Sequence, residues 1–199
     1  MNAGDRLDYR ALADACALTS DGWEVFAGST LTDAWIAAYK AVTAWPTEIV
    51  EIPQESVVYL FDAAPTLNPT EGIPGDDRVV AVWGRSRRTE RPRDRRRLAG
   101  FLPSPVAWSQ ADLDRGHLVA HAAGGGLDLN IFPQARSLNR GWSAEGRAWR
   151  RMEKYAAKHP GTPLFIRPIY TGPSWKPAAI EYGLFIDGEL SSERFTNTP

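Results

Sequence analysis

Cysteine is almost absent from this chain, since Cys16 is the only one among 199 residues. An internal disulfide is therefore excluded, and folding in a reducing compartment is permitted. No run of 18 apolar residues occurs, and the acidic first 23 residues lack the apolar stretch of a signal peptide. We therefore expect no membrane span and synthesis in the cytoplasm without a signal peptide, so any delivery outside the cell would need a specialised secretion system.

Other missing patterns exclude several kinds of active site. No cluster of cysteine and histidine has the spacing of a zinc site. No Gly-Lys-Ser or Gly-Lys-Thr follows the three glycines at 124–126, which excludes a nucleotide-binding P-loop. No serine lies in the context of a nucleophile elbow. Candidate chemistry is therefore sought in the polar, loop-rich stretch 114–142.

Charge is unevenly distributed although its net value is −1. Residues 1–50 hold three basic and seven acidic residues, whereas the other 149 hold 20 basic and 17 acidic ones. Arginine is far commoner than lysine, which suits phosphate or carboxylate recognition, although a high genomic GC content gives the same bias. Residues 85–97 contain eight arginines and two acids. This segment indicates either contact with a phosphate backbone or a solvated hairpin tip.

Hydrophobic patterning predicts an α+β fold with a mixed or antiparallel sheet. Helical spacing over 7–18 and 30–44 predicts a helical lead-in within residues 1–50, with Thr30 and Thr32 as candidate caps of its second helix. Residues 51–199 are expected to form the main domain. Its expected strands are 56–61, 78–83, 163–170 and 178–190, the last turning at Asp187-Gly188, and its expected helix is 143–158. Strands and helices do not alternate regularly, which argues against repeated βαβ units.

His117 is the strongest candidate for acid–base chemistry. It follows Asp-Arg-Gly, and a glycine allows the backbone to turn so that the next side chain points into a cleft. A neutral imidazole beside the guanidinium of Arg115 could act as the general base for a water that attacks a phosphate. Downstream, Asn130 and Asn139 offer uncharged oxygen atoms, and oxygen is the ligand that Mg²⁺ accepts.

Three short motifs resemble a known family. DRGH at 114–117, NIFPQ at 130–134 and LNRG at 138–141 are similar to those of the DNA/RNA non-specific endonucleases, and most similar to a bacterial branch found in toxins. The resemblance covers roughly residues 110–185. It implies a ββα-metal fold and a Mg²⁺- or Mn²⁺-dependent endonuclease that hydrolyses phosphodiester bonds of DNA, with RNA as a further substrate. For a toxin it also implies an immunity or other inhibitor protein as a partner.

The resemblance assigns roles to the residues of the motifs. His117 is expected to be the general base, Asn139 the direct ligand of a single metal ion, and Arg115 the residue that stabilises the transition state. Asn130 would orient either His117 or the backbone of the site, and Asp114 would position its own loop.

Two further expectations concern the surroundings of this site. Arg136 and Arg140 are expected to bind the nucleic-acid backbone. The glycines at 124–126 would form a tight turn between the two strands of the ββα unit.

The glutamate that holds the metal's water molecules in this family is displaced here. It usually lies eight residues after the ligand asparagine, where this chain has Arg147. Glu145 and Glu153 compete for the role, and the sequence around Glu153 matches the family better. Aligning Glu153 implies a six-residue insertion around 142–147, which must loop or bulge because a continuous helix would carry Glu153 too far, and Gly146 is the expected break.

The displaced glutamate leaves an alternative open. The chain could be a nucleic-acid-binding module on a catalytically degenerate nuclease fold that uses residues 85–97. A third possibility is a purely protein-binding effector, which would show no salt-dependent affinity for DNA.

Overall fold

The computed structural model describes residues 6–64, 78–89, 112–172 and 176–198. Six strands form one sheet in the order β1-β2-β3-β6-β7-β8, and two others, β4 and β5, pair separately. Every pairing is antiparallel, so the predicted α+β class is confirmed. The strands of the large sheet are β1 (Ile49–Gln54), β2 (Val57–Asp62), β3 (Arg78–Arg85), β6 (Pro163–Ile169), β7 (Ala179–Ile186) and β8 (Glu189–Thr196).

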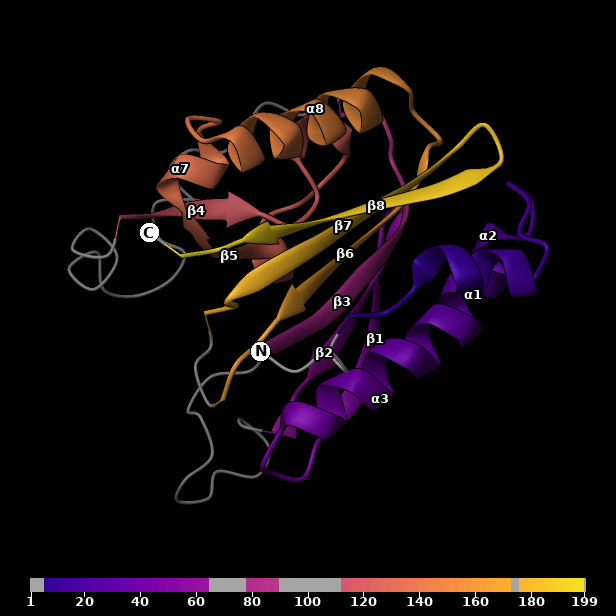
Figure 1. Cartoon of the computed structure of the whole chain (residues 1–199), viewed down its shortest axis with the longest axis horizontal. Coiled ribbons are helices and arrows are strands. Elements are labelled where there is room, and N and C mark those ends of the chain that lie inside the picture. The colour runs from indigo at the N-terminus through magenta and orange to yellow at the C-terminus, as the bar shows by residue number, and fades with distance from the viewer. Residues whose placement is uncertain (1–5, 65–77, 90–111, 173–175, 199) are drawn as a thin grey trace.

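The large sheet is covered on both faces, as Figure 1 shows. Successive side chains of a strand point to opposite faces, so in β6 Leu164 and Ile166 join one core while Phe165 joins the other. On one face lie α1 (Tyr9–Ala15), α2 (Trp23–Val25) and α3 (Thr32–Val42). On the other lie β4 (Leu113–His117), β5 (Ile131–Ala135), α7 (Arg136–Asn139) and α8 (Ala144–Lys158).

The helical lead-in forms the layer on the first face. Trp23, Leu31 and Trp35 are fully buried there, and the Trp35 ring lies 5.3 Å from that of Phe165 in β6. Complete burial of a side chain of this size stabilises the fold by roughly 1.5–3 kcal/mol. Most of the apolar residues that gave the helical spacing at 7–18 and 30–44 are therefore those that pack on the sheet.

Thr30 and Thr32 do not cap the second helix, so that prediction was wrong. The helix is continuous from Trp23 through a π-helical segment, Phe26–Leu31, into α3. The Thr32 hydroxyl donates to the carbonyl of Ala27 at 2.9 Å instead of capping a free end. A threonine inside a helix satisfies its hydroxyl in this way, and its sequence signal resembles that of a cap.

A buried ion pair ties the lead-in to the sheet. Glu181 of β7 lies 3.0 Å from Arg167 of β6, and both side chains are almost fully buried. The Tyr9 hydroxyl at the start of α1 donates to the same carboxylate at 2.5 Å. Burial, followed by the nearby Glu181 charge, raises the pKa of Tyr9, so the phenol remains a donor. The Glu181 carboxylate therefore connects β6 and β7 to the helical layer.

The strand predictions were largely correct, and the exceptions are local. Segment 178–190 is a hairpin of β7 and β8 that turns at Asp187 and Gly188, both with positive φ. β1 was not predicted. It lies at the sheet edge with side chains that are mostly half-buried or exposed, so it lacks a strong hydrophobic pattern. Among the residues described, no helix has both the length and the apolar character needed to cross a bilayer.

The arginine-rich segment 85–97 is described only as far as residue 89. Arg85 ends β3 and pairs with Glu24 at 2.6 Å, and Arg87 pairs with Glu55. The remainder of the segment lies outside the described residues. These two arginines neutralise acids of this chain, which fits the prediction of a phosphate contact less well than a structural role.

Candidate functional site

β4 and β5 form a separate antiparallel ladder that leads into α7 and α8. Asp114 lies opposite Gln134 in its register, and His117 lies opposite Ile131. Apolar residues of this unit, among them Phe132, Leu138 and Trp149, pack on the second face of the large sheet. The ladder and its two helices are therefore packed together on one face of the large sheet.

A pocket of about 380 Å³ opens where β4, α7 and α8 meet. Its lining residues are Arg115, His117, Ala120, His121, Ala122, Asn139, Arg140, Arg150 and Glu153. Of the seven predicted site residues, five therefore share one cavity. Asn130 and Arg136 do not line it.

Gly116 allows the strand that carries His117 to pack tightly. A Cβ atom built at Gly116 would lie 2.2 Å from the side-chain oxygen of Gln134. Only glycine fits there, because that separation is well inside van der Waals contact. His117 follows at the end of β4 and is 5% exposed. The pocket wall therefore holds a largely desolvated imidazole.

Asn130 holds the backbone that follows His117. Its side-chain oxygen accepts from the backbone N–H of Val119 at 2.8 Å, and its nitrogen donates to the carbonyls of Val119 at 2.8 Å and Gly126 at 2.9 Å. The side chain is fully buried, and these three hydrogen bonds occupy both its amide oxygen and its amide nitrogen. Of the two roles predicted for Asn130, the geometry matches orientation of the site backbone.

The glycines at 124–126 do not form a tight turn, so that prediction was wrong. β4 and β5 are joined by residues 118–130, which include the 3₁₀ turns His121–Ala123 and Asp128–Asn130. Gly124 has a φ of 97°. A Cβ atom at Gly125 would lie 1.8 Å from the carbonyl oxygen of Val119. The glycines let the loop fold back against its own backbone, which places His121 in the pocket.

Asp114 is the centre of the polar contacts around the ligand candidate. Its carboxylate accepts from Asn139 Nδ2 at 2.9 Å and from two nitrogens of Arg140 at 2.8 and 2.9 Å. Partial burial raises the pKa of Asp114, but the hydrogen bonds from Arg140 and Asn139 outweigh it and hold the pKa below its usual value. Because Asp114 takes the amide nitrogen of Asn139, the amide oxygen is the end left for a cation.

This orienting role was missed in the sequence, where Asp114 was expected to position only its own loop. Asp114 and Asn139 are far apart in the chain, and only the packing of α7 on β4 joins them. The signal available beforehand was the DRGH motif itself, which places an acid near the candidate base.

Arg136 and Arg140 are both engaged by acids. Arg136 pairs with Asp112 at 2.7 Å, and Arg140 pairs with Asp114 at 2.8 Å. Their charges are therefore partly compensated, which weakens the prediction that they bind nucleic acid. Arg150, to which no role was given, lines the pocket, and its Nη1 donates to the backbone carbonyl of Asn139 at 3.3 Å.

The helix breaks between Asn139 and Ala144, not at Gly146 as predicted. α7 ends at Asn139, Gly141 has a φ of 74°, and Ser143 caps α8 by accepting from the N–H of Gly146 at 2.9 Å. Gly146 lies in the first turn of α8. A Cβ atom there would lie 2.4 Å from the carbonyl oxygen of Ser137, so glycine permits close packing of α8 on α7.

The two candidate glutamates lie in different surroundings. Glu145 accepts from the backbone N–H of Thr196 at 3.0 Å and from its hydroxyl at 3.3 Å, at the end of β8. Glu153 lines the same pocket as Asn139. Of the two candidates, Glu153 is therefore the one placed to hold water molecules near Asn139.

The donors in the pocket suit a hydrated magnesium ion. Within the described ranges, no group of three or more His, Cys, Asp and Glu side chains is placed to hold a metal ion, so a closed zinc-type site does not fit. The amide oxygen of Asn139 and the carboxylate of Glu153 are hard oxygen donors. Mg²⁺ keeps several of its water molecules and needs few protein atoms when a phosphate completes its shell.

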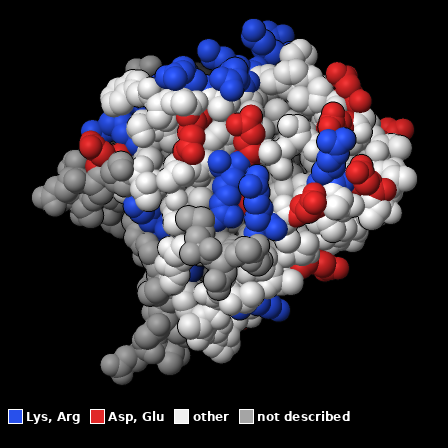
Figure 2. Space-filling view, viewed as in Figure 1, with Lys and Arg blue, Asp and Glu red and all other residues white. Residues whose placement is uncertain are grey.

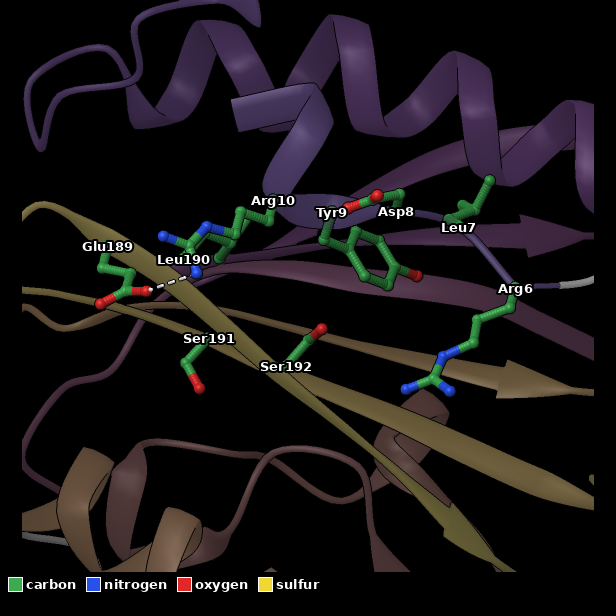
Figure 3. A pocket seen from close by; sticks show the side chains of 9 residues that line it. All are labelled: Arg6, Leu7, Asp8, Tyr9, Arg10, Glu189, Leu190, Ser191 and Ser192. Atoms are coloured by element: carbon green, nitrogen blue, oxygen red, sulfur yellow. Dashed lines mark ion pairs between the residues drawn. The ribbon is translucent and has the colours of Figure 1, made fainter. Parts of the chain in front are cut away.

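A larger pocket, of about 570 Å³, lies between the start of α1 and β8 (Figure 3). Its charged pair is Arg10 with Glu189 at 3.4 Å, and both side chains are mostly exposed. The Tyr9 hydroxyl is committed to Glu181. This pocket has no histidine or amide side chain in its lining, so the smaller pocket beside α8 is the better candidate for hydrolysis.

Comparison with known proteins adds no relative. No family model matches the chain, and no curated protein matches it. The functional argument therefore depends on the three motifs and on the geometry described above.

Proposed function

We propose that this protein is a Mg²⁺- or Mn²⁺-dependent endonuclease with a ββα-metal core, which cuts DNA or RNA without sequence preference. The observation that carries the proposal is the single pocket that gathers His117, Asn139 and Glu153 from β4, α7 and α8. Their meeting in one cavity with Arg115 suits hydrolysis of a phosphodiester.

His117 acts as the general base in this proposal. Its neutral imidazole takes a proton from a water molecule while the water oxygen forms a bond to phosphorus. The bond from phosphorus to the O3′ leaving group breaks, and that oxygen takes up a proton from solvent water, while His117 later returns its own proton to solvent. Arg115, beside His117 in the pocket, stabilises the added negative charge.

The residues that would hold the metal ion are Asn139, through its amide oxygen, and Glu153, through water molecules of the ion. When bound, the ion supplies Lewis acidity to the phosphate and to the leaving oxygen. Asp114 and Asn130 position these groups without touching substrate, since their side chains are committed to Asn139 and to the loop backbone. The toxin role and the inhibitor partner belong to the same proposal and are supported only by the resemblance.

Plasmid nicking tests the proposal. We expect the wild-type protein to nick DNA with Mg²⁺ and not with EDTA, and His117→Ala to lose about 10²- to 10⁴-fold in rate. His159→Ala is the matched control, because His159 is exposed at the end of α8 and should leave the rate unchanged. Binding of DNA by the wild type without any nicking would favour the degenerate binding module instead.

A further inference from the structure

The fold does not bury the side chain of Trp142. It is 62% exposed, whereas Trp23, Trp35 and Trp149 are fully buried. It lies in the short connection between α7 and α8, next to the candidate site. Single exposed apolar side chains are common on protein surfaces, so what distinguishes Trp142 is the set of charged residues around it.

Contacts fix the Trp142 ring relative to the site. The Arg140 guanidinium lies 5.1 Å from the centre of the ring. Arg140 is in turn held by two hydrogen bonds to Asp114, which accepts from Asn139. The indole therefore stands at a defined place beside the candidate metal ligand, with one face towards Arg140 and most of its surface open to solvent.

A row of cations runs from Trp142 along α8. Arg147, Arg151, Lys154 and Lys158 recur at the spacing of one helix face and are all exposed. None of these four forms an ion pair with an acid in the described part of the chain. Figure 2 shows basic side chains gathered along the edge where α8 runs in Figure 1. We call these four residues the α8 row.

The α8 row and Trp142 are continuous. Arg147 Nη1 donates to the backbone carbonyl of Trp142 at 3.3 Å, so the first cation of the row contacts the residue that carries the indole. The helix rises by about 16 Å between Arg147 and Lys158, over which one strand of B-form DNA carries about five phosphates. Arg136 and Arg140 are paired with acids of this chain, whereas the charges of the α8 row are not offset by a neighbouring acid among the residues described and can attract a polyanion.

We propose that Trp142 and the α8 row bind single-stranded nucleic acid, with an unpaired base stacked on the indole and the backbone along α8. The proposal rests on the proposed function, which makes nucleic acid the substrate, and adds the form that is preferred. Bases inside a duplex are already stacked on their neighbours, so only an unpaired base can occupy an exposed ring. Base stacking on an aromatic side chain together with a basic groove is sufficient for sequence-independent single-strand binding.

Binding measured in EDTA tests this without cleavage. The probes are fluorescent strands of about 15 nucleotides: oligothymidine, an abasic strand of the same length, and a duplex. We expect the wild type to bind oligothymidine more tightly than the abasic strand. Trp142→Ala should weaken binding of oligothymidine about 5- to 100-fold and leave binding of the abasic strand unchanged, whereas Trp142→Phe should retain most of the affinity.

The α8 row has its own readout and matched controls. Replacing its four cations by glutamine should reduce the slope of log affinity against log salt by about 0.7 for each phosphate that is no longer neutralised, and by about 3 in total. Lys40→Gln, an exposed cation on α3 in the opposite layer, should leave the slope unchanged. Val25→Ala is the control for Trp142, because Val25 is also apolar and 75% exposed. Thermal melting shows that each variant is folded.

The outcomes separate this proposal from the nuclease proposal. If Trp142→Ala affects the three probes equally, or none of them, the stacking surface is refuted even if Mg²⁺-dependent nicking persists. If base-dependent binding occurs but no substrate is cut with Mg²⁺, hydrolysis is refuted and the single-strand surface stands. A slope that does not respond to replacement of the α8 row overturns the path of the backbone along α8.

Discussion

Asp114→Asn tests whether the hydrogen bonds behind the pocket control the metal ligand. The asparagine has the same shape, but its nitrogen cannot accept a hydrogen bond. Asn139 and Arg140 would then compete for one oxygen, and the Asn139 amide would be free to turn over. Loss of a residue that orients a metal ligand typically costs 10- to 100-fold in metal affinity or activity.

The cost to stability follows from the same contacts. The Asp114 side chain is 12% exposed, so its carboxylate is well shielded from water. A hydrogen bond to a charged group contributes about 1.5–3 kcal/mol, and loss of one such bond to Asn139 should lower the melting temperature by about 3–12 °C in a chain of this size. Asp112→Asn is the control, since Asp112 is 70% exposed and pairs only at the surface, where an ion pair contributes little.

The effect on stability should depend on pH in a defined direction. The pKa of Asp114 in the folded protein lies below its usual value. Its stabilisation is therefore fully present above the unfolded pKa of about 3.9 and is lost as the pH falls through the lower, folded pKa. The difference in melting temperature between wild type and Asp114→Asn should thus be large at neutral pH and shrink in acid.

Two measurements decide the matter. Initial nicking rates as a function of Mg²⁺ concentration should show that Asp114→Asn needs about 10- to 100-fold more Mg²⁺. Melting curves should show the loss of stability. A variant that melts earlier but keeps the wild-type Mg²⁺ dependence would refute the view that Asp114 presents Asn139 to a cation.

Four further substitutions test separate parts of the structure. Glu153→Gln should reduce nicking strongly with little loss of stability, whereas Glu145→Gln should weaken the contact with Thr196, lower the melting temperature slightly and keep activity; the reverse pattern would contradict the assignment of Glu153. Gly116→Ala should destabilise the fold by about 1–3 kcal/mol in urea denaturation because its Cβ would meet the Gln134 side chain, and a neutral result would be inconsistent with that packing. Tyr182→Phe should be neutral or stabilising by about 1 kcal/mol in the same assay, because its buried hydroxyl has no hydrogen-bond partner in the described structure; a loss of stability would reveal a partner.

Local patterns predicted much of the fold. Alternating and β-branched segments marked β2, β3 and β6, and the Asp187-Gly188 turn marked the β7–β8 hairpin. These signals succeed because burial of one strand face and left-handed turn geometry depend on neighbouring residues. β1 was missed because a strand at the sheet edge can keep polar residues on its exposed side.

Two glycines that follow Asn139 show which features could not be predicted from neighbouring residues alone. A break after Asn139 was expected from helix length alone, but it was placed at Gly146, whereas the chain turns at Gly141. Gly141 has the positive φ of a turn, whereas Gly146 is required by the close approach of Ser137. The first is a property of one residue, while the second arises only when two helices pack.

The sequence by itself determined which side chains could do chemistry, because the residue types fix which imidazole, amide and carboxylate groups the chain carries. The tertiary structure decided which of them meet. It brought Glu153 and not Glu145 to Asn139, committed Arg136 and Arg140 to acids, and left Trp142 exposed beside them. These outcomes depend on distances between segments far apart in the chain, and such distances are set by the packing of whole layers on the sheet.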